Sequence, residues 1–408
     1  MLKEAGKVRT DTRMLGLLAL DIYCAYTILS STAYTEMLGG RVFSMLWQIM
    51  IGFLILRVIL DDEHTVLQLF AWMLVFPVVI VIVRNVGANR LFLQMSLAML
   101  LYGIPFRRIV RHVFGSCLFW TLFTALSCAA GILKDLEFNH GTVQQPVIAH
   151  GLGFNYYSNF AFLIMTITFA WLYLRGRKCT IAELVLLAAV HYVCYRYIHT
   201  TRLVVLTTGA YLILFLLCVK LEVLTFRHRI WKWLAMLLPF VMFGGTWAAV
   251  WGYDRMRHLF ALADKSFPSL TSRLNQSAQA YHEYGVRLLG NKLYLQGNQY
   301  VNFSEMKSGL YLDSNYVYLL LVYGIVFSIL ILVLLSALYG HIYEAHDPCL
   351  FIWFGSILMI SMVNNFLLNG LYNVGLLLLA EMLACPEGKE DRNEQQHSDQ
   401  PDRIACGD

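Results

Sequence analysis

Long uninterrupted apolar runs dominate the sequence, and they restrict its fold more than any other feature. Examples are LLALDIYCAYTILSSTAY, FSMLWQIMIGFLILRVIL and VFSILILVLLSALY. A helix needs about 20 apolar residues to cross a bilayer core of roughly 30 Å, and these runs approach that length. Charged residues make up only 14% of the chain, against about a quarter in soluble domains. The sequence therefore predicts an all-α, polytopic integral membrane protein.

The spacing of these runs predicts about twelve transmembrane helices in a single membrane domain, residues 1–384. The expected cores are 14–35, 43–60, 65–83, 91–105, 113–132, 157–174, 180–198, 202–219, 232–250, 316–338, 349–367 and 369–384. The fourth and the twelfth are short, and LLNGLYN leaves the boundary between the last two open. Residues 385–408 are polar, which predicts a disordered cytoplasmic tail.

Lys and Arg are unevenly distributed between alternate loops, and this bias predicts the orientation. PFRRIVRH, RGRK and KLEVLTFRHRIWK belong to the more basic set, so we expect these loops and both termini to be cytoplasmic. Two longer loops, 133–156 and 251–315, then lie outside the membrane. Within the second, LTSRLNQSAQAYHEYGVRLLG has helical spacing and reaches a stop signal at Gly290. We expect this loop to carry one or two helices on the outer membrane surface.

Several classes of site have no signature in the sequence. The nine cysteines include no Cys-x-x-Cys pair, and there is no His-Glu-x-x-His or glycine-rich phosphate loop. We therefore expect no metal and no cofactor. The net charge of +5 is modest and better explained by loop orientation than by nucleic-acid binding.

Ionisable residues near the outer ends of the spans are the informative ones, because such residues are costly to bury in lipid. Arginine suits phosphate groups, since its planar fork binds bidentately and stays charged. An acid at the start of a helix could act as a general base or orient a sugar hydroxyl, and nearby tyrosines could stack on sugar rings. We take Asp313, Arg202 and Arg273 as candidate catalytic residues. The candidate substrate-binding residues are Arg196, Arg287, His150, Asn159, His282, Asn315 and Tyr316.

Each of these residues also has a purely structural interpretation. Arg202 could anchor a helix end by extending to the membrane surface. Asp313 and Ser314 are favoured helix N-cap types, and an acid there complements the helix dipole. His282 could belong to a solvated face, and the tyrosines could form an interfacial aromatic belt.

Taken together, four segments resemble the O-antigen polymerase and ligase superfamily, the Wzy-type polymerases of bacterial surface polysaccharides. HGLGFNYYSNFAFLIM resembles a Gly-Phe and Asn segment after a medium outer loop. YIHTTRLVVLTTGAYLILFLL resembles a helix headed by Ser or Thr and Arg. LTSRLNQSAQAYHEYGVRLLGN resembles the long-loop pattern of Arg, helix and Gly. LDSNYVYLLLVYGIVFSILILVLL resembles an Asp or His followed by Tyr and Gly.

The resemblance, which covers roughly residues 140–335, implies a metal-independent glycosyltransferase. It would join undecaprenyl-diphosphate-linked repeat units into O-antigen, capsule or exopolysaccharide at the outer face of the inner membrane. Arg202 and Arg273 would hold the diphosphate, and Asp313 would be the base or would orient the acceptor. The flippase and the chain-length regulator of the same pathway would be its partners. Two departures from the family pattern are His150 in place of Arg and Asp313 in place of His.

Other functions stay open at this stage. The ligase branch differs in its acceptor, and the missing His favours a polymerase. A flippase or another transporter would show inverted repeats and broken helices with midplane polar residues. We find no internal repeat, and the acids Asp21, Glu183 and Glu381 are expected near helix ends. A different polyprenyl-phosphate transferase would usually place an acidic pair in the first outer loop, which has only Glu36.

Overall fold

The computed structural model describes residues 12–61, 64–139, 147–199, 201–226, 228–263, 270–295, 299–300, 306–307 and 310–383. Within these residues, eight helices are long and apolar enough to cross a membrane. Many large apolar side chains point outward, for example Val66 at 85% and Ile59 at 70% exposure. This is the pattern of a multi-pass membrane protein, as the sequence predicts. The expected tail at 385–408 lies outside the described residues.

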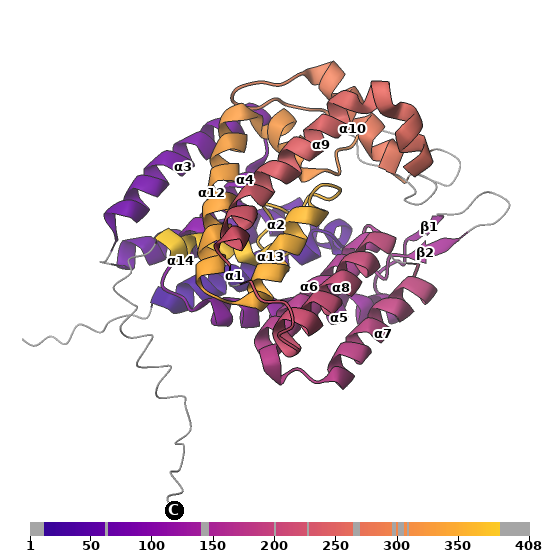
Figure 1. Ribbon diagram of the computed structural model, residues 1–408, viewed down its shortest axis with the longest axis horizontal. Coiled ribbons are helices and arrows are strands. Elements are labelled where there is room, and N and C mark those ends of the chain that lie inside the picture. Colours follow the sequence, from indigo (N-terminus) through magenta and orange to yellow (C-terminus); the bar gives the residue numbers. More distant parts are fainter. Residues whose placement is uncertain are drawn as a thin grey trace, which may run out of the picture.

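The first half of the chain forms a group of long helices and one hairpin (Figure 1). The helices are α1 (Thr12–Leu29), α2 (Tyr34–Leu60), α3 (Val66–Val86), α4 (Asn89–Leu100), α5 (Phe106–Ala129) and α6 (Tyr157–Arg175). Strands β1 (Glu137–Asn139) and β2 (Ile148–His150) pair antiparallel, with Phe138 opposite Ala149. Figure 1 shows this hairpin at one margin of the molecule.

The second half adds shorter and more irregular elements. The helices are α7 (Ile181–Tyr197), α8 (Arg202–Phe215), α9 (Arg229–Ala263), α10 (Leu270–Tyr284), α11 (Asn315–Tyr318), α12 (Gly324–Glu344), α13 (Pro348–Ile360) and α14 (Leu379–Leu383). The 3-10 helices η1 (Gly176–Lys178) and η4 (Val374–Leu378) and the π-helices η2 (Leu216–Lys220) and η3 (Leu319–Tyr323) extend or join them. Short strands β3 (Gln299–Tyr300) and β4 (Met306–Lys307) pair antiparallel.

Hydrogen bonds between distant loops define one end of the bundle, which we call the loop face. Backbone bonds tie Ala33 to Gly153 and Asn155 to Ser31, which joins the α1–α2 connection to the segment before α6. His150 N donates to Ile198 O, so the hairpin also contacts the end of α7. The segment that follows α10 lies at the same end, since Asn85 at the end of α3 donates from Nδ2 to Leu289 O. The start of α11 lies there too, because the charge of Asp313 acts on Tyr156. The connections α2–α3, α4–α5, α6–α7, α8–α9 and α12–α13 are joined by hydrogen bonds of their own and form the opposite face.

A break at Gly324 bends the helix that begins at Asn315. Gly324 has φ +87° and ψ 175°, far from helical values, and the π-helix η3 directly precedes it. The segment after α10 fills this break: Ile325 N donates to Arg287 O, and Asn291 N donates to Val322 O. A Cβ built on Gly324 would lie 2.4 Å from the backbone nitrogen of Gly290. Two glycines distant in the sequence therefore allow this close approach.

The last expected spans are less regular than the sequence predicts. In place of a helix over 349–367, α13 ends at Ile360, and an irregular segment follows to Asn373. Backbone bonds inside this segment are local turns, such as Asn373 N to Asn369 O at 2.8 Å. Amide side chains and Gly370 compete with the helical backbone here, since Asn favours turns and Gly is a poor helix former.

The helices around the long loop also differ from the expected bounds. α9 runs to Ala263, well into the region 251–315 expected as a loop. α10 matches the expected helix within it but ends at Tyr284, with Gly285 at φ +63° as its stop. Gly290 does not end this helix; it serves the contact with Gly324. The nearer glycine with a left-handed conformation is the one that stops the helix.

Candidate functional site

An ion pair at the loop face joins two residues that the sequence singles out. Arg273, in the first turn of α10, donates from Nε to Oδ2 of Asp313 at 2.9 Å. The side chains are 30% and 34% exposed, so the pair is neither fully buried nor freely solvated. The Nη groups of Arg273 are not used by this bond, and a guanidinium has five N–H donors in all. Arg273 could therefore hold Asp313 and an anion together.

Asp313 does not serve as the cap of α11. The cap is Ser314, whose hydroxyl accepts from Val317 N at 3.5 Å. Asp313 thus stands one residue outside the helix. Burial raises the pKa of the Asp313 carboxyl above its ordinary value, and the charge and hydrogen bond of Arg273 oppose that rise. A carboxylate with a raised pKa is the type of group that general base catalysis uses.

Tyr156 connects this ion pair to the segment before α6. The charges of Asp313 and Arg273 both influence its phenol, and burial is the main cause of its raised pKa. Its ring packs against Phe138 of the hairpin, with centroids 5.3 Å apart, and against Tyr157 at 4.6 Å. Segments around residues 138, 156, 273 and 313 therefore meet at one place.

A cavity of about 660 Å³ opens beside this place. The ends of α1, α4 and α6 line it, together with η3 and the irregular segment after α13. The lining residues are Tyr23, Tyr26, Thr27, Ser30, Ser31, Gly87, Ala88, Asn89, Arg90, Leu93, Gln94, Asn155, Asn159, Tyr318, Tyr323, Asn365, Leu368, Asn369 and Tyr372. Amides and hydroxyls dominate the polar lining, and Arg90 is the single charged side chain in this set.

Two asparagines close in sequence to this place connect it to the cavity. Asn155 lines the cavity and immediately precedes Tyr156. Asn315, two residues after Asp313, donates from Nδ2 to Oδ1 of the cavity-lining residue Asn365. The side chain of Asn315 is buried, and its Oδ1 has no hydrogen-bond partner among the described residues. The segments that carry Asp313 and its neighbour Tyr156 therefore adjoin a polar cavity, although neither Asp313 nor Arg273 lines it.

The structure places two further predicted residues close to this cavity. Asn159 lines it directly. His150 is held at the end of β2, where its Nδ1 lies 2.8 Å from Oδ2 of Asp135. Asp135 Oδ1 also accepts from Leu152 N at 2.8 Å, which fixes the turn after the hairpin. His150 therefore has a clear structural role, because it and Asp135 shape the loop that carries Asn155 and Tyr156.

The remaining predicted residues are not brought together with Asp313 by any described contact. Arg202 begins α8 and donates from Nε to the hydroxyl of Tyr195 at 3.2 Å. Arg196 is exposed in the last turn of α7. His282 Nε2 lies 3.4 Å from Oδ2 of Asp254, with both side chains exposed. Arg287 is exposed at the end of the segment that fills the Gly324 break.

Tyr316 belongs to the protein interior. Its side chain has no exposed surface, and its hydroxyl donates to the Leu358 carbonyl at 2.9 Å. Its own carbonyl accepts from Trp247 Nε1 at 3.2 Å. Tyr316 thus joins α11 to α9 and α13, whereas Tyr318 and Tyr323 face the cavity.

Sequence reasoning missed most of the cavity lining. Arg90, Gln94, Asn365 and Asn369 come from segments far apart in the chain, and none forms a motif. A signal was available in NNFLLNGLYN, where four amides interrupt an apolar run. Amides at membrane depth are costly unless they face protein or a cavity, so this run could have been flagged as functional.

Asp21 was also misjudged from the sequence. It is not near a helix end but is the tenth of the 18 residues of α1. Its Oδ2 lies 2.9 Å from His112 Nδ1, and its Oδ1 accepts from Ser116 Oγ at 2.9 Å. An acid midway along α1 therefore meets a histidine and a hydroxyl in the first half of α5.

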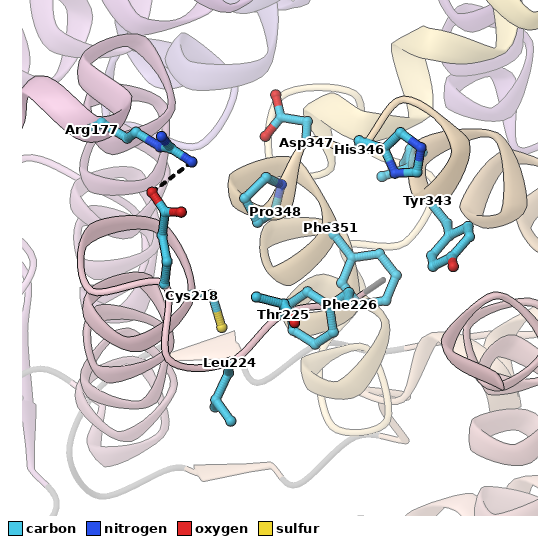
Figure 2. Close-up of a pocket in the computed structure, with 12 residues that line it drawn as sticks. Arg177, Cys218, Leu224, Thr225, Phe226, Tyr343, His346, Asp347, Pro348 and Phe351 are labelled. Atoms are coloured by element: carbon cyan, nitrogen blue, oxygen red, sulfur yellow. Dashed lines mark ion pairs between the residues drawn. The ribbon is translucent and has the colours of Figure 1, made fainter. Parts of the chain in front are cut away.

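A second cavity, of about 500 Å³, opens at the opposite face (Figure 2). Figure 2 shows Arg177 paired with a carboxylate across the cavity from Phe226 and Phe351; the partner is Glu222, at 2.6 Å. Asp347 also lines it and caps α13 through Leu350 N. Burial raises the pKa of Asp347. Both carboxylates thus have structural partners here.

Comparison with known proteins gives no relative: no family model, no curated protein and no solved structure matches the chain. Within the described residues, no group of three or more His, Cys, Asp or Glu is arranged to hold a metal ion.

Proposed function

We propose that the protein is a membrane glycosyltransferase that polymerises undecaprenyl-diphosphate-linked repeat units into a surface polysaccharide. The Arg273–Asp313 pair at the edge of the loop-face cavity carries this proposal. Amides, hydroxyls and tyrosine rings are suited to sugars, because they offer both donors and acceptors together with flat apolar faces. An arginine and an acid at the cavity edge supply the two groups that transfer from a diphosphate requires.

The proposed step is a displacement at the anomeric carbon of the donor glycan. The acceptor hydroxyl attacks this carbon, the bond to the diphosphate oxygen breaks, and undecaprenyl diphosphate leaves with the bonding electrons. The Asp313 carboxylate takes the proton of the acceptor hydroxyl. The Nη groups of Arg273 stabilise the charge that builds on the leaving oxygens. Arg202, which makes no described contact with Asp313, would bind the part of the diphosphate farther from the reacting carbon.

The topology expected from the sequence fits this function. Besides the eight long apolar helices, α4, α7, α13 and the η4–α14 segment are shorter elements that would complete twelve crossings. Both termini would then lie on the same side, at the opposite face. The Arg and Lys residues of η1, η2 and the start of α9 lie there, which favours the cytoplasm for that face. The loop face would then lie at the outer surface of the inner membrane. There it would encounter the flipped lipid-linked units, together with the flippase and the chain-length regulator.

A transporter is a second candidate, and one observation favours it. The break at Gly324 and the irregular segment 361–373 are discontinuities in helices, and both adjoin the loop-face cavity. Broken helices around a polar cavity are typical of secondary transporters. In a proton-coupled transporter Asp313 would bind and release the transported proton. In the transferase it takes a proton from the acceptor hydroxyl, so the two candidates differ in what Asp313 does. A ligase would share the donor site but transfer the glycan to another acceptor.

Polymer length in cells tests the proposal. Cells deleted for the gene are complemented with wild type, Asp313→Asn, Arg273→Gln or Arg202→Gln, and surface polysaccharide is separated on a gel. We expect loss of the ladder for the first two at normal protein levels. Glu283→Gln is the matched control, since Glu283 is an exposed acid on the same helix as Arg273. Normal ladders from both Asp313→Asn and Arg273→Gln would exclude this site.

A further inference from the structure

The Asp21–His112–Ser116 cluster lies away from the loop-face site and has no part in the proposed reaction. Asp21 sits halfway along α1, and His112 and Ser116 lie on α5, which packs against it. The side chains of Asp21 and His112 are 38% and 32% exposed. The two bonds of Asp21 are satisfied within the cluster, but part of the cluster still faces out of the bundle.

Outward exposure at this depth is costly in a membrane protein. Ionisable residues within membrane helices normally face the bundle interior, a water-filled cavity or another protein. The cluster lines neither of the cavities described above. Nε2 of His112 has no described hydrogen-bond partner, while Nδ1 is used by Asp21. Nε2 of His112 is therefore available to bind a group outside the cluster.

The surface around the cluster is shaped for another helix. His112, Gly115, Ser116 and Phe119 recur at intervals of three and four residues, so they share one face of α5. A Cβ built on Gly115 would meet no atom within 4 Å, so the space above it is open. Small residues let helix backbones approach closely in membranes, and polar side chains then bond between helices. Leu18 and Phe119 flank this face and are 44% and 58% exposed.

We propose that this face, formed by Leu18, Asp21, His112, Gly115, Ser116 and Phe119, binds a second copy of the chain. In a dimer with its two-fold axis along the membrane normal, each residue and its copy in the partner lie at the same depth in the membrane. The cluster supplies both halves of a hydrogen bond at that depth: the imidazole of one copy can donate to the carboxylate of the other. The face therefore carries both a donor and an acceptor and can pair with a copy of itself. A surface with only donors or only acceptors could not.

Photocrosslinking between differently tagged copies tests this dimer. A photoreactive amino acid replaces Phe119 or Leu18 in membranes that contain both tagged forms, and the products are probed for both tags. We expect a band with both tags from these positions, and none from Ile213 on α8 or Val333 on α12, which are 60% and 51% exposed. A band with one tag and an unrelated protein, or no band with both tags, would overturn the proposal.

Two variants separate the interface from the fold. The Cβ of Gly115→Leu would meet no atom of the chain within 4 Å, so this variant should fold normally and lose the band with both tags. Gly244→Leu is the matched control, because Gly244 is an exposed helical glycine on α9 that also has open space around it. The same band from Gly115→Leu as from wild type would contradict close packing at α5. His112→Leu combined with Asp21→Leu should likewise lose the band, and its retention would contradict the role of the polar cluster.

Discussion

Gly290 and Gly324 lie in direct backbone contact, and this contact joins the segment after α10 to the helix that carries Asp313. Both have φ close to +87°, which L-residues with a side chain rarely adopt. A Cβ on Gly290 would lie 2.6 Å from the carbonyl oxygen of Val322. The contact therefore positions α10, and with it Arg273, relative to the start of α11.

Gly324→Ala should destabilise the protein and weaken its activity together. A left-handed conformation costs of order 1–3 kcal/mol for a residue with a side chain, and the overlap with Gly290 adds to this. The melting temperature in detergent should fall clearly. Gly244→Ala, at a helical position with open space, should leave it unchanged or slightly raised. Equal melting of Gly324→Ala and wild type would show that the contact contributes nothing.

Arg273→Gln should shift the pH dependence of activity upward. Asp313 acts as a base only when ionised, so activity falls as pH drops through its pKa. Arg273 lowers that pKa against the rise caused by burial. Without the guanidinium the pKa of Asp313 should be higher, so the acid limb of the activity profile should move to higher pH. Activity at neutral pH should fall about 10²–10³-fold, because stabilisation of the leaving group is also lost. Arg273→Lys, which keeps the charge, should shift the limb less. An unchanged acid limb in Arg273→Gln would show that Arg273 does not influence the titration of Asp313.

Asp313→Asn should lose activity without losing stability. Because the folded-state pKa of Asp313 is raised, its ionisation opposes folding as pH rises above the ordinary value of 3.8. A neutral amide avoids this cost, and the cap of α11 is Ser314, which is unchanged. The melting temperature at neutral pH should therefore equal or exceed that of wild type, while activity falls about 10²–10⁴-fold. A much lower melting temperature would show that Asp313 is chiefly structural.

Arg57→Met should destabilise the opposite face. Arg57 is 1% exposed at the end of α2, and its guanidinium donates to the carbonyls of Leu100, at 2.6 Å, and of Tyr102. These carbonyls belong to the last residue of α4 and to the turn after it, where helical partners are missing. Bonds from a charged donor contribute about 1.5–3 kcal/mol each, so the loss should be large. Arg41→Met, at an exposed position on the same helix, is the control. Equal stability of the two variants would contradict the role of Arg57.

Asn159→Leu should weaken use of the lipid-linked glycan without unfolding the chain. Asn159 faces the loop-face cavity from the first turn of α6, and replacing its amide with an apolar group removes donors and acceptors for a sugar. We expect KM to rise more than kcat falls, measured with purified protein. Thr225→Val, in the cavity at the opposite face, is the control and should change neither constant. An unchanged KM for Asn159→Leu would argue against a glycan in this cavity.

The sequence predicted the broad architecture and singled out both residues of the central ion pair for physical reasons. Apolar runs of membrane length leave little freedom, so the long helices were expected from composition alone. Arg273 was singled out because a guanidinium suits phosphate groups, and Asp313 because an acid stands there at the start of an apolar run, but their pairing was not predicted. Their 2.9 Å contact joins α10 to the segment before α11, and no local pattern along the chain encodes such a contact.

The cavity and the membrane cluster lay beyond local patterns. Asn365 and Arg90 face one space only because the irregular segment after α13 folds back beside α4. Asp21 was expected near a helix end, because the apolar run around it does not define the residue at which α1 begins. The partner that satisfies it, His112, lies on a helix four elements later. Such pairings follow from helix packing rather than from spacing along the chain.

Direct observation of glycan transfer tests the central proposal most directly. Purified protein in vesicles is supplied with an undecaprenyl-diphosphate-linked repeat unit from the source strain, and mass spectrometry follows chain elongation and the release of undecaprenyl diphosphate. We predict one released carrier for each joined unit with wild type, and neither product with Asp313→Asn. Absence of both products from folded wild-type protein, or equal transfer by Asp313→Asn, would contradict the account.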